Sequence, residues 1–143
     1  MVNETLILRK LSELEQYSGQ ITEFKEITVN AYENDWKLQR IIERTLQMMI
    51  ETCVDIAGHI ISDNNFRIPD SYADTFKVLS DNKIIPEGLC QAMVQISKFR
   101  NIIVHHYDRV DAEIVVGILR KRLDDFNSYK KSILDYLHPK KIK

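Results

Sequence analysis

The apolar residues between positions 38 and 61 recur at spacings of three and four, and this pattern constrains the fold more than any other feature of the chain. The series is Leu38, Ile41, Ile42, Leu46, Met49, Cys53, Ile56, Ala57, Ile60 and Ile61. An α-helix turns once in about 3.6 residues, so these side chains share one broad face of a helix. The pattern predicts a long helix that is central in the fold and the most buried.

Shorter segments with the same spacing predict four more helices. The five predicted helices run from about residue 4 to about residue 28, along the long segment above, through Phe76 and Leu79, from Pro86 into residues 99–107, and from a break at 108–111 to Tyr136. Asn3, the pair Asn34 and Asp35, either Asp70 or Ser71, and the break from Asp108 to Asp111 are expected to cap helix N-termini, because their side-chain oxygens accept backbone N–H groups there.

Glycine and proline are scarce, with four and three in 143 residues. Both residues interrupt helices, so their scarcity favours helices over sheets. The chain shows neither an internal repeat nor a linker. We therefore predict an all-α fold in which residues 1–143 form a single domain, a helical bundle of about five helices.

Charge and hydropathy exclude several classes of protein. The net charge is −1 at pH 7, so the chain lacks the basic field of many nucleic-acid-binding proteins, and phosphate recognition must be local. Apolar runs are too short to span a membrane, and the N-terminus lacks a signal-peptide pattern. We expect a soluble, cytoplasmic protein with no membrane partner.

The cysteines indicate neither a metal site nor a disulfide. Cys53 and Cys90 lie in apolar helical patterns, with no CxxC motif and no Cys/His cluster. They are expected to be small buried hydrophobic residues, as free cysteines commonly are. No metal and no cofactor is predicted.

Residue types with catalytic uses flank a short apolar run in the segment from Phe99 to Tyr107. Arg100 and Asn101 precede residues 102–104, and two histidines and the tyrosine follow. Because the apolar run seeks the core, Arg100 and His105 are expected at a partly desolvated rim. A neutral histidine can accept a proton from a ribose 2′-hydroxyl while an arginine stabilises the charge on the phosphate, which suffices for RNA cleavage without metal.

The spacing of Arg100 and His105 does not by itself let both side chains act on one ligand. Arg100 and His105 are five residues apart, about 140° around a regular helix, and would not share a face. Either the helix ends or distorts near Val104, or a second copy of the chain completes the site. From residue types alone, such a pair is more often a salt bridge and a helix cap than a catalytic pair.

Arg100, four residues, His105, one residue and Tyr107 resemble the signature of the HEPN superfamily, and specifically of its HepT-like toxin branch. The likeness extends along nearly the whole chain, in Asp55–Ile61, in Pro69–Tyr72, in Phe76 with Leu79, and in the order of the helices. It implies a HEPN-like four-helix core within the bundle.

The resemblance also implies a function. Members of the family are metal-independent ribonuclease toxins that act as homodimers, with the active site in the cleft between protomers. An MntA-like minimal nucleotidyltransferase antitoxin silences them by transferring AMP to the tyrosine of the motif. Arg100 and His105 are then the expected catalytic residues, and Tyr107 the expected site of adenylylation. The expected substrate is RNA, and the sequence does not choose between transfer and messenger RNA.

Other polar residues are candidates for supporting roles. Asp55 and His59 are four residues apart on the long helix and are expected to form a hydrogen-bonded pair, either buried and structural or catalytic. Asn101 could bind phosphate or cap a helix end. His106 is expected on the surface or against a partner. Basic clusters at 120–122, 130–131 and 140–141 are solvated helix faces that could line an RNA path in a dimer.

Two other functions compete with an endoribonuclease toxin. One is a non-catalytic HEPN binding module that partners a nucleotidyltransferase, and the other is a purely structural helical dimer. The arginine, histidine and tyrosine at the spacing of the motif disfavour both, because a silent module has no need of all three.

Overall fold

A computed structural model describes residues 3–106, 108 and 110–139, and this part of the chain contains helices and no strand. The seven α-helices are α1 (Glu4–Thr22), α2 (Val29–Glu33), α3 (Trp36–Asp63), α4 (Tyr72–Asp81), α5 (Glu87–His105), α6 (Ala112–Lys121) and α7 (Leu123–Leu137). The predicted all-α class is confirmed. Among the described residues, no helix has both the length and the apolar character that crossing a membrane requires.

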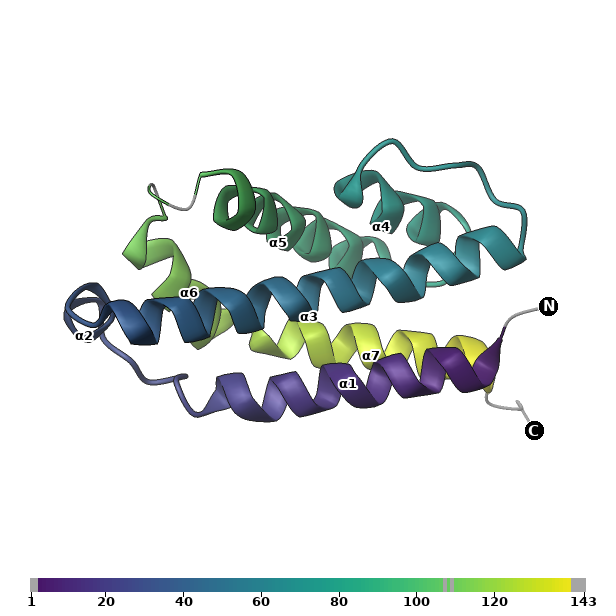
Figure 1. The fold of residues 1–143 in the computed structure, drawn as a ribbon. Coiled ribbons are helices and arrows are strands. Elements are labelled where there is room, and N and C mark those ends of the chain that lie inside the picture. Colours follow the sequence, from purple (N-terminus) through teal and green to yellow (C-terminus); the bar gives the residue numbers. More distant parts are fainter. Residues whose placement is uncertain (1–2, 107, 109, 140–143) are drawn as a thin grey trace.

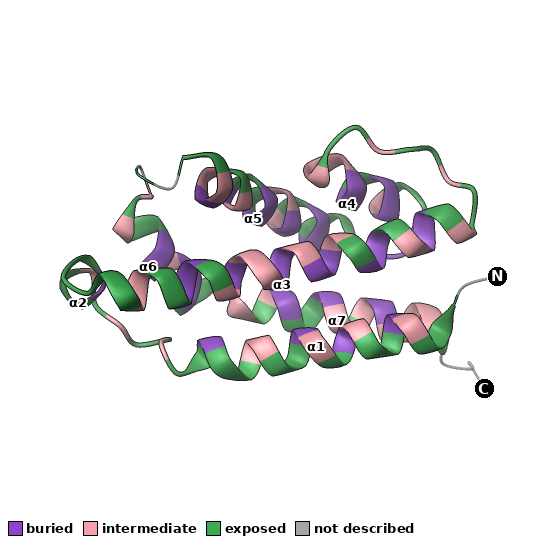
Figure 2. Ribbon diagram, in the orientation of Figure 1, coloured by how far each residue is buried: buried purple, intermediate pink, exposed green. Residues whose placement is uncertain are grey.

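Helix α3 is the axis of the bundle (Figure 1). It packs against α1 on one side and against α4 and α5 on the other, while α7 lies beside α1 and also contacts α5. Its apolar face is buried, as Figure 2 shows. Eight side chains of this face are fully buried: Ile42, Leu46, Met49, Ile50, Cys53, Ile56, Ala57 and Ile60. The prediction of a central, buried helix is confirmed.

Four side chains cap helix N-termini as their positions in the sequence predict. Each accepts a hydrogen bond from a backbone N–H two or three residues later, at 2.8–3.1 Å: Asn3 for α1, Asp35 for α3, Ser71 for α4 and Asp111 for α6. Of the two alternatives for α4, Ser71 is the cap and Asp70 is not. These bonds satisfy N–H groups that have no partner within the helix.

The first predicted helix is too long, because α1 ends at Thr22 rather than near Thr28. Residues 23–27 form tight turns in which N–H groups bond to carbonyls three residues back, such as Phe24 to Ile21 at 3.0 Å. Thr28 then starts α2, since its hydroxyl accepts the N–H of Ala31 at 3.0 Å. A threonine that bonds its local backbone competes with helix continuation, and apolar spacing does not detect this.

The last predicted helix is divided at Arg122 into α6 and α7. Apolar residues continue at helical spacing across the division, through Leu119, Leu123 and Phe126, so the sequence pattern shows no break. The reason is tertiary: α6 packs against α2, whereas α7 packs against α1 and α5. One straight helix would not reach both positions (Figure 1).

Candidate active site

Arg100 lies on the face of α5 that meets α3, with 17% of its side chain exposed. Its Nε and Nη2 donate to one carboxylate oxygen of Glu51, at 2.9 and 2.8 Å, and its Nη1 donates to Asn101 Oδ1 at 3.3 Å. The expectation that Arg100 sits at a partly desolvated rim is confirmed. A charge in such a place requires an opposite charge nearby, and α3 supplies it.

Two further side chains hold this pair. Gln47, one turn before Glu51 on α3, donates its Nε2 to the same carboxylate oxygen at 3.1 Å. The ring of Tyr72, the first residue of α4, lies under the guanidinium, with Arg100 Cζ 4.5 Å from the ring centroid. Arginine is attracted to aromatic faces at this distance. Helices α3, α4 and α5 therefore converge on one cation.

His105 is the last residue of α5 and is exposed. The helix stays regular to this point, because the N–H of His106 donates to the carbonyl of Ile102 at 2.8 Å. It ends one residue beyond Val104, without a distortion that would bring His105 to the face of Arg100. The expectation that His105 lies at a desolvated rim is wrong, since its side chain is exposed to solvent. Tyr107 lies outside the described residues.

The predicted hydrogen bond between Asp55 and His59 is not among those of the described residues. Asp55 is exposed and instead accepts the Nζ of Lys10 on α1, at 3.4 Å, so a buried structural pair is ruled out. Both residues nevertheless line one cavity of about 610 Å³, together with Tyr72. Tyr72 therefore borders this cavity and also contacts Arg100, which does not line it.

For Asn101 the structure excludes one of the two predicted roles, whereas for His106 it agrees with the predicted position. Asn101 is within α5 rather than at its end and accepts from Arg100, so it is not a helix cap. It is exposed at the side of the guanidinium, where a phosphate contact remains open to it. His106 is exposed at the helix end, as predicted.

Sequence analysis missed the residues of α3 that border this site. Glu51 contacts Arg100 directly, and Gln47 contacts it through Glu51. Arg40 and Arg44 line a pocket of about 360 Å³ together with Val104. The only feature of the sequence that could have indicated these residues is the recurrence of polar side chains along one face of α3. Such a face is ordinarily solvated, and no local pattern shows that α5 lies beside it.

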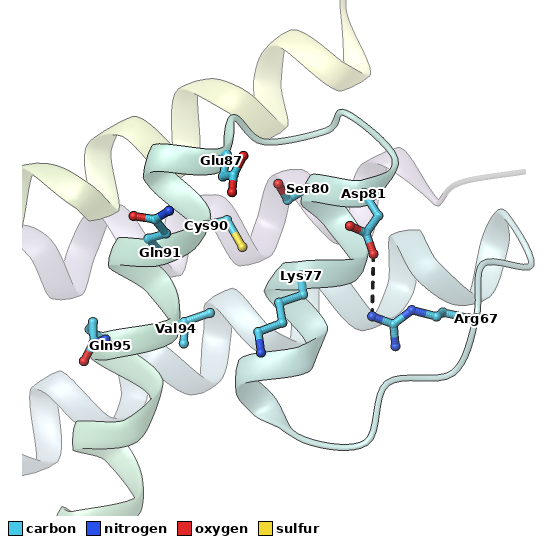
Figure 3. Close-up of a pocket in the computed structure, with 9 residues that line it drawn as sticks. All are labelled: Arg67, Lys77, Ser80, Asp81, Glu87, Cys90, Gln91, Val94 and Gln95. Carbon is cyan, nitrogen blue, oxygen red and sulfur yellow. Dashed lines mark ion pairs between the residues drawn. The ribbon is translucent and has the colours of Figure 1, made fainter.

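A separate groove lies between α4 and α5, with a volume of about 600 Å³. Figure 3 shows its lining, in which Arg67 forms an ion pair with Asp81 at 3.6 Å. Cys90 opens into the groove, and partial burial raises the pKa of its thiol. Neither Arg100 nor His105 lines this groove, so we place no step of the chemistry there. Among the described residues, no group of three or more metal-ligating side chains could hold an ion.

Comparison with known families gives one match that spans most of the chain. Residues 7–133 match the family model described as Ribonuclease HepT-like. The mRNA nuclease HepT of Shewanella oneidensis is 32% identical over 123 residues, which are 86% of this chain and 86% of that protein. The tRNA nuclease HepT of Aphanizomenon flos-aquae is 27% identical over 138 residues, 95% of this chain and 92% of that one.

Solved structures show the same likeness. One is a tri-AMPylated HEPN toxin of Shewanella oneidensis in complex with MNT antitoxin. It superposes with a TM-score of 0.83 at 28% identity, and the match covers 94% of this chain and 98% of that one. The arrangement of the helices is therefore shared over nearly the whole of both chains.

Proposed function

This chain belongs to the HepT-like family of ribonucleases, and we propose that it is a metal-independent RNA endonuclease toxin that uses Arg100 and His105. The observation that carries the proposal is the state of Arg100, a half-buried cation that Glu51 holds by Nε and Nη2 while one N–H of each terminal nitrogen is left for a ligand. A guanidinium in this state matches the oxygens of a phosphate, because its donors form a rigid planar fork.

The proposed reaction is an internal phosphoryl transfer. His105, in its neutral form, accepts the proton of a ribose 2′-hydroxyl, and the 2′-oxygen forms a bond to the adjacent phosphorus. The bond from phosphorus to the 5′-oxygen breaks, and that oxygen takes a proton from solvent. Arg100 stabilises the negative charge that gathers on the other phosphate oxygens. The products are a 2′,3′-cyclic phosphate and a 5′-hydroxyl.

A second copy of the chain completes the site in this proposal. Arg100 and His105 lie on different faces of a regular α5, so one copy does not present both to the same phosphate. A homodimer that apposes the ends of two α5 helices would bring the His105 of each copy towards the Arg100 of the other. Arg40 and Arg44, next to Val104, would then line the cleft as contacts for the RNA backbone.

The proposed partner is an MntA-like nucleotidyltransferase antitoxin that transfers AMP to Tyr107. The tri-AMPylated toxin from Shewanella oneidensis, bound to its MNT antitoxin, supports this regulation. An AMP group adds a negative charge and a bulky purine near His105, where the RNA phosphate must sit. Repulsion and steric blockage then both oppose substrate binding.

The experiment that tests this function is RNA cleavage in the absence of metal. Purified protein is incubated with total RNA in EDTA and, separately, in Mg²⁺, and the product ends are analysed. We expect equal cleavage in both and a 2′,3′-cyclic phosphate, which a phosphatase removes only after dilute acid has opened the ring to a 2′- or 3′-monophosphate. Dependence on Mg²⁺, or 3′-hydroxyl ends, would contradict the mechanism.

A further inference from the structure

One carboxylate oxygen on α3 receives three donors. Glu51 Oε2 accepts the Nε and Nη2 of Arg100, at 2.9 and 2.8 Å, and the Nε2 of Gln47 at 3.1 Å. Glu51 is 49 positions from Arg100 in the sequence, so this contact exists only because α3 and α5 pack side by side. Gln47 fixes the carboxylate from its own helix, and the carboxylate in turn fixes the cation of the other helix.

The Glu51 carboxylate occupies one edge of the Arg100 guanidinium and leaves a second edge available for substrate. Arginine has five N–H donors in a plane. Glu51 takes the edge formed by Nε and Nη2, and Asn101 takes one donor of Nη1 at 3.3 Å. Two donors remain, one on each terminal nitrogen, and such a pair binds two oxygens of a phosphate. Glu51 therefore orients Arg100 without competing for the donors that substrate needs.

Tyr72 restricts the remaining freedom of the guanidinium. Its ring lies 4.5 Å from Arg100 Cζ and covers one face of the plane. A hydrogen-bonded edge and a covered face together fix the plane of the cation, because rotation about the long side chain would break one of the two contacts. A free arginine samples many rotamers. Here most of that freedom is lost before substrate arrives.

We propose that Glu51 is a positioning residue for Arg100, held by Gln47 and assisted by Tyr72, in the cleavage of RNA. The inference rests on the proposed function and adds to it a residue from α3. Glu51 itself touches neither the phosphate nor the 2′-hydroxyl. Its contribution is geometric, and misplacing a charge-stabilising group by about 1 Å can cost on the order of 10²-fold in rate.

The first test compares three variants in single-turnover cleavage with varied RNA concentration. Glu51→Ala should lower the maximal rate by about 10-fold or more with little change in the half-saturating RNA concentration, because transition-state geometry is lost. Glu51→Gln keeps an acceptor oxygen and should recover much of the rate. Glu15→Ala is the matched control, since it removes a carboxylate that bridges α1 and α7, 2.9 Å from Lys130.

The second test asks whether Glu51 acts through Arg100. In an Arg100→Ala background, Glu51→Ala should cause no further loss, whereas independent sites would multiply their effects. Full activity of Glu51→Ala overturns the proposal. So does an equal loss in Glu51→Ala and Glu51→Gln with a shifted acid limb of the pH profile, because that result would make Glu51 a proton carrier.

The third test does not depend on RNA cleavage. The Nε–H resonance of Arg100, identified by its disappearance in Arg100→Lys, should be protected from solvent exchange in the wild type and lose protection in Glu51→Ala. Protection without RNA cleavage would contradict the proposed function and leave the geometric hold intact. An unprotected Nε–H in the wild type would overturn the positioning role itself.

Discussion

Arg100 is accommodated in a half-buried position because its neighbours replace the water that it has lost. Glu51 supplies the opposite charge and Tyr72 the aromatic face, each from a different helix. His105 has no such surroundings and stays in solvent at the end of α5. The two residues of one short motif therefore have different environments, one fixed by packing and the other free to meet a partner or substrate.

Tyr107 carries the first prediction at the scale of single residues. Tyr107→Phe keeps the aromatic ring but loses the oxygen that would accept AMP. Cells expressing this variant should remain poisoned in the presence of the cognate nucleotidyltransferase, whereas the wild type is neutralised. Intact-mass spectrometry after co-expression should show added AMP on the wild type alone. Modification of Tyr107→Phe to the same extent would move the regulatory site elsewhere.

The sequence alone identified Arg100, His105 and Tyr107 as candidates, because their spacing is local and resembles a family motif. It did not identify Glu51, since nothing near position 51 indicates a contact with position 100. The Asp55 and His59 pair shows the opposite error. Helical spacing permits their contact, but Lys10 on a neighbouring helix takes the carboxylate.

At the scale of elements, the loop between α3 and α4 is fixed to the first turn of α4. Asp74 accepts Nη1 and Nη2 of Arg67, at 2.7 and 2.8 Å, and the N–H of Asp70 at 3.0 Å. This clamp lies two residues from Tyr72, which supports Arg100. The position of the site therefore depends on a loop contact outside it.

The clamp predicts a pH dependence of stability. The hydrogen bonds from Arg67, and then that from Asp70, hold the pKa of Asp74 below its ordinary value of 3.8. A carboxylate with a lowered pKa in the folded state stabilises the fold above its ordinary pKa, and this contribution is lost as pH falls through the folded value. Asp74→Asn should therefore lower the thermal midpoint at about pH 6, and the difference from wild type should shrink steadily as pH falls below the ordinary value of 3.8.

Asp81→Asn is the control for this prediction, because Asp81 contacts Arg67 only at 3.6 Å. Its effect on the thermal midpoint should be smaller. A difference between wild type and Asp74→Asn that stays constant from about pH 6 to about pH 2 would show that the carboxylate charge plays no part.

The existence of the longer helices was predictable at this scale, but the short α2 (Val29–Glu33) was missed and helix boundaries were less predictable. Apolar spacing finds any segment with one buried face, and the caps at Asn3, Asp35 and Asp111 mark starts through local chemistry. The turn before Thr28 comes from a local hydrogen bond that competes with the helix, and the division at Arg122 comes from the positions of neighbouring helices. The spacing of apolar residues along the sequence contains neither kind of information.

For the whole molecule, the central expectation is an isologous homodimer. The first, second and last predicted helices together carry more apolar positions than a small bundle can face inward. The described part leaves five large hydrophobic side chains exposed: Leu8, Trp36, Ile41, Ile68 and Ile114. The surplus is smaller than expected, because α1 and α7 bury their apolar faces within the bundle. Light scattering at micromolar concentration should report about twice the chain mass. A monomer that still cleaves RNA would exclude a site shared between copies.

His105 and its neighbour His106, at the end of α5, allow the most direct test of whether Arg100 and His105 carry out RNA cleavage. Single-turnover cleavage in EDTA is compared for the wild type, His105→Ala, Arg100→Ala and His106→Ala, with folding checked by circular dichroism. Loss of the proton acceptor or of the charge stabiliser should each reduce the rate by roughly 10²-fold or more, while His106→Ala cleaves as the wild type does. Full activity in His105→Ala, or an equal loss in His106→Ala, would contradict the account.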